Sequence, residues 1–495
     1  MTPQLLILAA LLTPFIGALV ALCLPTRPKA AAWTAVVATA LTLAASIALV
    51  PVVADGSVHA VHAGNWPAPF GIVLVADAFA TIMLVVCQLV ILASLIFCAH
   101  TLSSYYQRRH LYPLILTLSL GTNGALLTGD LFNLYVWFEV LLLSSFSIMA
   151  MIRGKDGRAA AWRYVVINLV SSLLFLTAAG LIYGKTGTLN FAELRLRFGE
   201  EESSFLIDSS AALLFGAFGI KAALIPLAFW LPRAYPQLPP AISALFAGLL
   251  TKIGLYAFYR VFGMVFSDGT SFPHQNLLFV VAILTMVGGV LGAVAQGDMR
   301  RILSFHIISQ VGYMALALAL FTPLALTAGI FYLAHHIIVK ANLFLATSLV
   351  EKHAGSSDLG KVSGVARSSP LIALLFAVPA LSLAGLPPLS GFFAKFALLQ
   401  ASLAGQEWVA SAAIVAVGLL TVFSMLKIWR AVFWGESNES RPAPLLILAL
   451  TSGVLALVAI AVGLCTGPIL AFAEQAASSL LDPSAYLESV LQQSK

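Results

Sequence analysis

The sequence predicts an all-α polytopic membrane protein with about 14 transmembrane helices, two inverted five-helix repeats, and breaks in the seventh and twelfth helices. Of the 495 residues, 60% are hydrophobic and only 9% are charged, which excludes a soluble globular protein. Apolar stretches of about 20 residues, each long enough to cross the hydrocarbon layer, recur along the whole chain. Prolines near the middle of two of these stretches predict the breaks.

Fourteen candidate spans follow one another along the chain. They are residues 4–24, 31–53, 78–99, 110–128, 131–152, 164–184, 207–231, 239–262, 276–297, 303–321, 325–350, 370–399, 408–434 and 445–466. The first span has no basic residue before it, and the first positive charges, Arg27 and Lys29, follow it. This arrangement predicts an uncleaved first span with its N-terminus outside, rather than a signal peptide.

The links between the spans carry Lys and Arg unequally. With the N-terminus outside, 17 of these residues lie in cytoplasmic links and 5 in outer links, and four lie within spans, which completes the total of 26. Arg441 belongs to the cytoplasmic set and Lys495 to the outer set. Because cytoplasmic links are enriched in Lys and Arg, this division predicts an inner-membrane protein with both termini outside.

The two proline-containing spans are the seventh and the twelfth. The seventh contains Pro226, and the twelfth contains Pro387 and Pro388. Proline removes a backbone donor and clashes with the preceding turn, so both helices should break near the middle. At that depth, free backbone groups are tolerated only where protein or a water-lined cavity satisfies them.

Equal spacings predict that the two broken spans belong to repeated halves. Three pairs of polar residues are 174 or 175 positions apart: Lys221 and Lys395, Lys252 and Lys427, and Asn168 and Asn342. Broken helices in two halves are typical of inverted-repeat transporters. The predicted domains are three N-terminal helices (1–109), a first repeat that translocates protons (110–262), a second repeat (263–435), and a last helix with an outer amphipathic tail (436–495).

Four lysines lie inside the spans: Lys221, Lys252, Lys340 and Lys395. A cation at the bilayer centre costs roughly 3 kcal/mol, so four unpaired ones would cost on the order of 10 kcal/mol. Their one carboxylate companion near mid-bilayer is Glu139, in the fifth span. We therefore expect the amines to face a protein interior or a water-filled path, where they can exchange protons.

Glu139 and Lys221 are the predicted switch. A carboxylate beside a buried amine stabilises its protonated form, so pairing would hold the proton and separation would release it. A static salt bridge that joins two helices is the alternative.

The remaining candidates for proton exchange are three lysines and two histidines in other spans, which would form a row with Glu139 and Lys221. Lys252 lies too far from either end of its span to reach an interface, and the alternative for it is a structural hydrogen bond to a carbonyl. His336 and Lys340 are four residues apart on one helix face, and histidine titrates in the physiological range. His335 is one step round that helix, with its role open. Lys395 ends the series, and the alternative for it is reaching an interface.

Several other functions are excluded. The two adjacent histidines would suit a metal pair, but no third ligand is evident, so no metal site is expected. The four cysteines lie in or beside apolar runs without a CxxC pair, which predicts small buried hydrophobes. No nucleotide, dinucleotide or haem motif predicts a cofactor, and the scattered basic residues exclude a nucleic-acid partner. Any work must draw on ion gradients or on partner subunits.

Four polar residues outside this row have simpler interpretations. Asp77 and Asp130 lie at span boundaries, which predicts helix caps. His59 and His62 fall in an outer loop and are expected to be solvated.

The chain also resembles a known family, and the resemblance lies in three stretches: GDLFNLYVWFEVLLLSSF, FGIKAALIPLAFWLPRAYPQLPPAISALFAGLLTKIGLYAFYRV and GLPPLSGFFAKF. Over nearly its whole length, the chain resembles the antiporter-like subunits shared by multisubunit monovalent cation/proton antiporters of the Mrp (or Pha) type and by respiratory complex I. Within that family, PPAISALFAGLLTKIGLYA is most similar to the D subunits of the antiporters.

The resemblance implies fourteen helices, two inverted repeats and roles for the polar residues. Glu139 and Lys221 match the paired glutamate and lysine of the fifth and seventh helices, and Lys252 matches the eighth-helix lysine. The polar eleventh helix is matched by His335, His336 and Lys340, and the terminal residue of the twelfth by Lys395.

The implied activity is export of Na⁺ or K⁺ in exchange for protons, by a transporter subunit rather than an enzyme, with other subunits of the complex as partners. Two alternatives stay open: a proton-pumping subunit of complex I or of a membrane-bound hydrogenase, and a structural scaffold.

Overall fold

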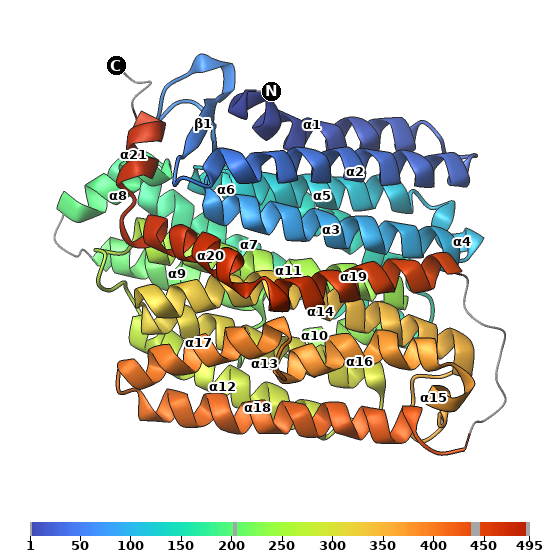
Figure 1. Cartoon of the computed structure of the whole chain (residues 1–495). Helices are drawn as coiled ribbons and strands as arrows, with labels where there is room; N and C mark the ends of the chain where they lie inside the picture. Colours follow the sequence, from blue (N-terminus) through green and yellow to red (C-terminus); the bar gives the residue numbers. More distant parts are fainter. Residues whose placement is uncertain (1, 201–204, 437–445, 492–495) are drawn as a thin grey trace.

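The computed structural model describes residues 2–200, 205–436 and 446–491, most of which are helical. The long helices lie side by side with nearly parallel axes, as expected of a chain that crosses a membrane repeatedly (Figure 1). Within the described residues, twelve helices are long and apolar enough to span a bilayer. The chain is therefore a multi-pass membrane protein.

The long helices follow the predicted spans. The first eight correspond to α1 (Pro3–Leu22), α2 (Pro28–Val53), α3 (Ala78–Thr101), α5 (Leu111–Leu127), α6 (Leu131–Ala150), α7 (Lys155–Thr186), α9 (Phe205–Ala222) and α11 (Pro240–Arg260). The last six correspond to α12 (Gln275–Val294), α13 (Met299–Leu320), α14 (Pro323–Ala354), the pair α16 (Pro370–Ala384) and α17 (Ser390–Ala404), α18 (Trp408–Ile428) and α19 (Leu446–Leu464). Twelve predicted spans thus each contain one long apolar helix, although α9 ends before the predicted span 207–231 does; the fourth span is the shorter α5, and the twelfth is the broken pair.

Short elements connect or cap these helices. They are α4 (Ser104–Gln107), α8 (Phe191–Glu200), α10 (Leu231–Ala234), α15 (Val365–Ser368), α20 (Thr466–Leu481), α21 (Ser484–Leu491), the 3₁₀ turns η1 (Ala63–Asn65) and η2 (Tyr235–Gln237), and the π-helical turns η3 (Val261–Val265) and η4 (Trp429–Phe433). Arg441, Lys495 and the first residue of the predicted span 445–466 lie outside the described residues.

A small β-hairpin interrupts the helical fold. Strands β1 (His59–His62) and β2 (Val73–Ala76) pair antiparallel. The prediction that His62 is solvated is wrong, because alternate residues of β1 face inward and His62 is only 8% exposed. His59, on the opposite face, is less buried and lies 3.2 Å from the Ser57 hydroxyl.

Burial corrects the interpretation of two cysteines. Cys87 and Cys98 are buried on α3, as predicted. Cys23 and Cys465 are exposed, so the prediction of a buried position is wrong for them. They directly follow the ends of α1 and α19.

Aspartate caps fix the starts of two helices, as predicted. An Asp77 carboxylate oxygen accepts a hydrogen bond from the Ala80 amide at 2.8 Å, at the start of α3. Asp130 accepts one from the Asn133 amide at 2.7 Å, at the start of α6. Each bond satisfies a donor that the first helical turn leaves free.

Asp77 also forms a buried ion pair with Arg260 of α11. The two guanidinium nitrogens of Arg260 lie 2.6 and 2.8 Å from the two carboxylate oxygens, and both side chains are nearly inaccessible. Arg260 additionally donates to the Tyr256 hydroxyl at 3.0 Å, and its guanidinium lies 5.6 Å from the ring centroid of Tyr486 on α21. This bidentate contact fastens α3, α11 and the C-terminal segment together.

We expect Asp77→Asn to lower the stability of the protein by roughly 3–5 kcal/mol, because Arg260 is left as an uncompensated buried charge while the amide oxygen can still cap α3. Thermal unfolding of the full chain checks this. Asp358→Asn is the matched control, since its 3.8 Å contact with Lys361 is largely exposed and is worth about 1 kcal/mol or less. Equal effects of the two substitutions would contradict the expectation.

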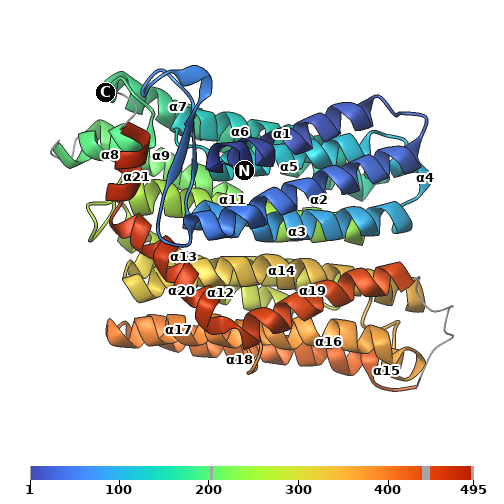
Figure 2. The ribbon, with the colours of Figure 1, turned by 45° about the horizontal axis from the view of Figure 1, so that its top comes forward.

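Three helices form the interior of the bundle. Nearly all residues of α11, α13 and α14 are buried, whereas most of the other helices expose one face. Figure 2 shows α1 to α9 and α11 on one side and α12 to α14 and α16 to α19 on the other, with α13 and α14 in the layer nearest the first group. Because α14 packs against both α11 and α17, residues on it can connect the two sides.

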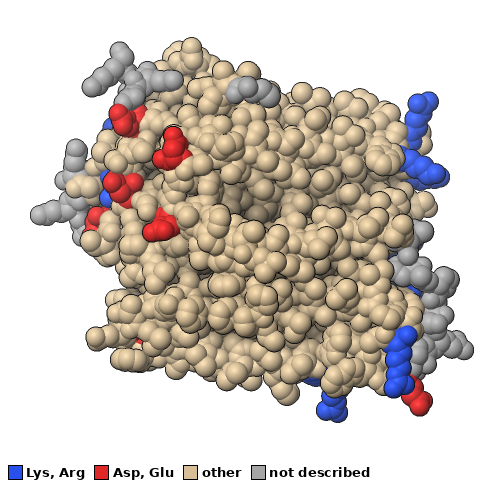
Figure 3. Space-filling view, viewed as in Figure 1, with Lys and Arg blue, Asp and Glu red and all other residues tan. Residues whose placement is uncertain are grey.

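The two ends of the bundle differ in charge. On the face shown in Figure 3, Lys and Arg gather at one end and most Asp and Glu at the other. The predicted amphipathic tail, α20 and α21, lies at the acidic end (Figure 1). Its apolar side, with Ala473, Ala476 and Leu480, is buried against the protein, chiefly along α14.

Candidate functional site

Both predicted helix breaks are present. The helix α9 ends at Ala222, and α16 ends at Ala384, with five residues between it and α17. Ala223 and Gly385, which follow the two ends, adopt left-handed backbone conformations with φ of 62° and 88°. Such residues terminate helices, and the prolines that follow prevent their continuation.

Lys221 is the penultimate residue of α9 and is 5% exposed. Among the described residues its ammonium has no hydrogen-bond partner, and it lies 4.7 Å from the ring centroid of Phe138 on α6. The half-buried Glu139, next to Phe138, accepts a hydrogen bond from the Ser172 hydroxyl of α7 instead. Glu139 attracts Lys221 electrostatically but makes no ion pair with it within 4 Å. The two members of the predicted switch are therefore close in the structure but are not paired.

Lys252 lies in the middle of α11 and is completely buried. Its ammonium donates to the backbone carbonyl of Ala247 at 2.5 Å. The structural hydrogen bond that was the alternative for Lys252 is thus present. Since an ammonium has three donors, this bond leaves Lys252 free to interact further.

The α14 helix brings three predicted residues together. His335, His336 and Lys340 are all buried, and within the described chain neither ring nitrogen of His336 nor the Lys340 ammonium has a hydrogen-bond partner. Lys252 acts electrostatically on both His336 and Lys340. His335 points elsewhere, since its Nδ1 lies 2.8 Å from the hydroxyl of Ser390, the first residue of α17. His335 therefore connects α14 to the second break.

Lys395 faces the second break rather than an interface. Its ammonium donates to the carbonyls of Leu383 and Ala384 at 2.8 and 3.1 Å. These are the last carbonyls of α16, where the helix dipole is negative. The ammonium also lies 5.5 Å from the ring centroid of Tyr313. Lys395 thus satisfies backbone groups that the break leaves free.

His306 of α13 belongs to the row, although it is not among the residues predicted from the sequence. It is completely buried, its Nε2 shares a hydrogen bond with the Ser424 hydroxyl of α18, and its Nδ1 has no partner in the described structure. The charges of Lys340 and Lys395 both act on it. Its place near the start of the predicted span 303–321 resembles an interfacial position, whereas α13 begins four residues earlier at Met299. A histidine inside an otherwise apolar span was the available signal.

The residues of the predicted repeat do not all correspond in the structure. Lys221 precedes its break, whereas Lys395 follows its own. Lys427 donates to the carbonyls of Val294 and Gln296 at the end of α12, at 2.9 and 2.6 Å, and so lies apart from the buried row. The division into repeats stays a prediction.

Gly391 permits the close packing at the second break. A Cβ at this position would collide with the Ser382 carbonyl oxygen of α16 and would lie 3.1 Å from Cε1 of His335. Glycine is therefore the residue that lets α16, α17 and His335 meet.

We expect Gly391→Ala to lower the stability by about 1–3 kcal/mol, because the added methyl group overpacks this contact and displaces α17 from His335. Thermal unfolding measures the effect. Gly180→Ala on α7 serves as the control, since nothing lies within 4 Å of a Cβ there and alanine favours a helix by up to about 1 kcal/mol. Unchanged stability of Gly391→Ala would show that the packing at the break is loose.

Together these residues form a row of buried amines and imidazoles across both sides of the bundle, ending in the half-buried Lys395: Lys221, Lys252, His336, Lys340, His306 and Lys395. Consecutive members from Lys252 onward act on one another electrostatically. In the described ranges, no three His, Cys, Asp or Glu side chains come together as metal ligands would. Such a row is suited to holding and passing protons.

Known proteins share this fold. The family described as NADH:quinone oxidoreductase/Mrp antiporter, TM, matches residues 128–421. The D subunit of the Na(+)/H(+) antiporter of Alkalihalophilus pseudofirmus is 45% identical over 454 residues, which cover 91% of this chain and 92% of that protein. A chain of the Mrp complex from Dietzia sp. DQ12-45-1b superposes with a TM-score of 0.93 and 38% identity, covering 99% of this chain and 100% of that one. A chain of the membrane-bound sulfane sulfur reductase, an archaeal respiratory membrane complex, gives 0.91 and 27%, covering 98% and 99%.

Proposed function

Because the chain belongs to the NADH:quinone oxidoreductase/Mrp antiporter transmembrane family, we propose that it is the D-type, proton-translocating subunit of a multisubunit monovalent cation/proton antiporter. The complex exports Na⁺ or K⁺ in exchange for protons that enter down their gradient. The observation that carries the proposal is the row of buried amines and imidazoles, whose middle members lie on the interior helices α11, α13 and α14.

In the proposed route, protons enter a half-channel and pass along the row. They move by way of Lys221, Lys252, His336, Lys340, His306 and Lys395 in turn, and leave on the other side. His335, bonded to Ser390, positions the second break against α14. Buried polar groups without a protein partner are usually hydrogen-bonded to water, which would supply the links between neighbouring stations.

Glu139 acts as the gate of this route. In the observed arrangement Ser172 holds the carboxylate, and Lys221 faces the Phe138 ring. With the pair apart, Lys221 can give up its proton, because burial without a partner disfavours the charged amine. Movement of Glu139 to Lys221 would favour the protonated amine and close the cycle.

The orientation follows from charge. We propose that the Lys- and Arg-rich end of the bundle (Figure 3) lies at the cytoplasmic surface of the inner membrane, with both termini outside, because cytoplasmic ends are enriched in Lys and Arg. Gln4 of α1 and Ala485 of α21 line one surface hollow, so the two described ends of the chain lie on the same side. Exposed apolar side chains on α6 and α7, including Leu143, Leu169 and Leu173, face lipid or the other subunits of the complex.

Antiport in everted membrane vesicles tests the proposal. Vesicles that contain this chain with its partner subunits should dissipate a preformed pH gradient when Na⁺ or K⁺ is added, as reported by a pH-sensitive dye. Vesicles with the partner subunits but without this chain are the control and should not respond. Fully assembled complex that shows no response to either cation would contradict the proposal.

A proton-pumping subunit of a redox-driven complex is the second candidate. The likeness to a chain of an archaeal respiratory membrane complex favours it. The two candidates differ in their driving force, since antiport requires only the ion gradients. Proton movement that depends on an electron donor, and not on Na⁺ or K⁺, would favour the second candidate.

A further inference from the structure

A basic cavity opens beside the first helix break, outside the row of buried amines. It has a volume of about 840 Å³ and lies between α7, the segment that follows α9, and the start of α13. Arg163, Arg233 and Arg301 line it, together with one carboxylate, Asp156. Three guanidinium groups against one carboxylate give the lining an excess of two positive charges, which suits an anion.

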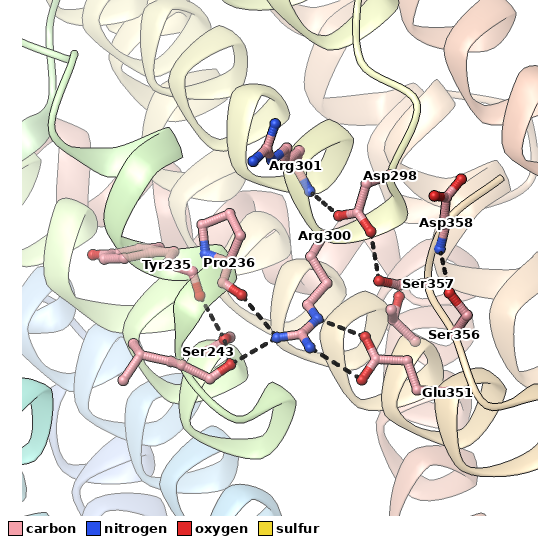
Figure 4. A network of polar contacts seen from close by, with 12 residues as sticks. Tyr235, Pro236, Ser243, Asp298, Arg300, Arg301, Glu351, Ser356, Ser357 and Asp358 are labelled. Carbon is pink, nitrogen blue, oxygen red and sulfur yellow. Dashed lines mark hydrogen bonds and ion pairs between the residues drawn. The ribbon is translucent and has the colours of Figure 1, made fainter. Parts of the chain in front are cut away.

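The three guanidinium groups are free to bind a ligand. In the described part of the chain, none of them donates a hydrogen bond or forms an ion pair, and all three side chains are exposed. Arg300, the neighbour of Arg301, differs: it binds Glu351 at 2.5 Å and the carbonyls of Pro236 and Leu238 at 2.8 and 3.0 Å. Figure 4 shows the Arg301 side chain pointing away from this network. Arg300 is thus held in structural contacts, whereas the Arg301 side chain lines the cavity.

The other half of the cavity is apolar. Ile225, Pro226, Phe229, Phe305 and Ile308 form this part of the wall. A free inorganic anion would use only the guanidinium groups, whereas a phospholipid would use both parts of the cavity.

The apolar surface continues along the outer face of α7. Next to Arg163, Trp162 is 69% exposed, and further along the helix Leu169 and Leu173 are 47% and 66% exposed. Tryptophan at a helix end is typical of the membrane interface, and exposed leucines farther in would lie against acyl chains. The headgroup of one lipid could therefore bind the arginines while its acyl chains lie against the apolar face of α7.

We propose that this cavity binds the headgroup of an anionic phospholipid, with its phosphate at Arg163, Arg233 and Arg301 and its acyl chains along Phe229 and α7. Basic pockets between transmembrane helices at the cytoplasmic surface bind such headgroups. Guanidinium groups suit phosphate because their donors can bind two of its oxygens at once. The site does not depend on the proposed transport activity.

Native mass spectrometry of the purified complex, titrated with phosphatidylglycerol or phosphatidylcholine, tests the site. The triple variant Arg163→Gln/Arg233→Gln/Arg301→Gln should bind phosphatidylglycerol at least about tenfold more weakly than the unmodified complex. Arg27→Gln/Arg108→Gln/Arg367→Gln removes the same charge from exposed arginines outside the cavity and should change binding by less than about twofold. Phosphatidylcholine should bind both complexes weakly and equally.

A second variant tests the site independently, in case the triple variant does not fold. Ala159→Trp fills the cavity wall on α7 without removing a charge, and it should weaken phosphatidylglycerol binding to a similar extent. Inorganic phosphate should not displace the lipid, and displacement would instead assign the site to a soluble anion. Equal phosphatidylglycerol binding by the unmodified complex and both cavity variants would overturn the proposal. Chemical cross-linking of a partner subunit to residues of the cavity wall would also overturn it, because that subunit would then occupy the cavity.

Discussion

Antiport by the Lys340→Met variant is expected to fall at least about tenfold, because the variant loses a proton-holding group at the centre of the row. Lys340 is completely buried, and no described residue hydrogen-bonds its ammonium. Methionine is an apolar side chain of similar length that cannot carry a proton. Since a buried charge without a partner destabilises a fold, the variant should assemble normally and be as stable as the unmodified protein or more so.

Vesicle antiport and thermal unfolding of the same preparation measure the two effects. Lys427→Met is the matched control, because Lys427 binds carbonyl groups at the end of α12 and lies outside the row. It should lose stability and keep most of its antiport per assembled complex. If Lys340→Met kept full antiport, or lost it only together with its stability, the structural-scaffold alternative would be favoured, in which the lysines stabilise the fold and carry no protons.

The second large effect is expected at Glu139. Glu139→Gln should lower antiport at least about tenfold, because the amide can still accept the hydrogen bond from Ser172 but carries no charge to stabilise protonated Lys221. The substitution therefore changes the gate while it leaves the contact between α6 and α7 in place.

Comparison with another glutamate makes this test specific. Glu474→Gln neutralises an exposed carboxylate on α20 and should leave antiport within about twofold of the unmodified complex, since exposed charges interact weakly. Antiport of Glu139→Gln at the level of Glu474→Gln would show that Glu139 does not gate the route.

Local sequence features predicted the spans and the breaks. Apolar stretches of membrane length correspond to the long helices, and Pro226, Pro387 and Pro388 lie where regular helix stops. These features depend on the residues of one segment, because each transmembrane helix satisfies its own backbone and each proline acts on its own turn. The buried positions of Lys252 and Lys340 followed from the same spans.

Contacts between helices could not be predicted in the same way. Ser172 binds Glu139 across α6 and α7, and His306 reaches the row because α13 packs beside α14. The carbonyl bonds of Lys395 depend on where α16 ends. The burial of His62 depends on its pairing in a hairpin. Each of these facts arises from packing between segments that lie far apart in the sequence.

The most direct test of the central claim is the pH dependence of antiport in Lys340→His and Lys340→Arg. The claim is that residue 340 acts by exchanging a proton. Histidine can do so and titrates at lower pH than lysine in water, so Lys340→His should keep measurable antiport with its optimum moved to lower pH. Arginine keeps the charge but does not release its proton, so Lys340→Arg should be inactive at every pH. An active Lys340→Arg, or an inactive but well-assembled Lys340→His, would contradict the proton route.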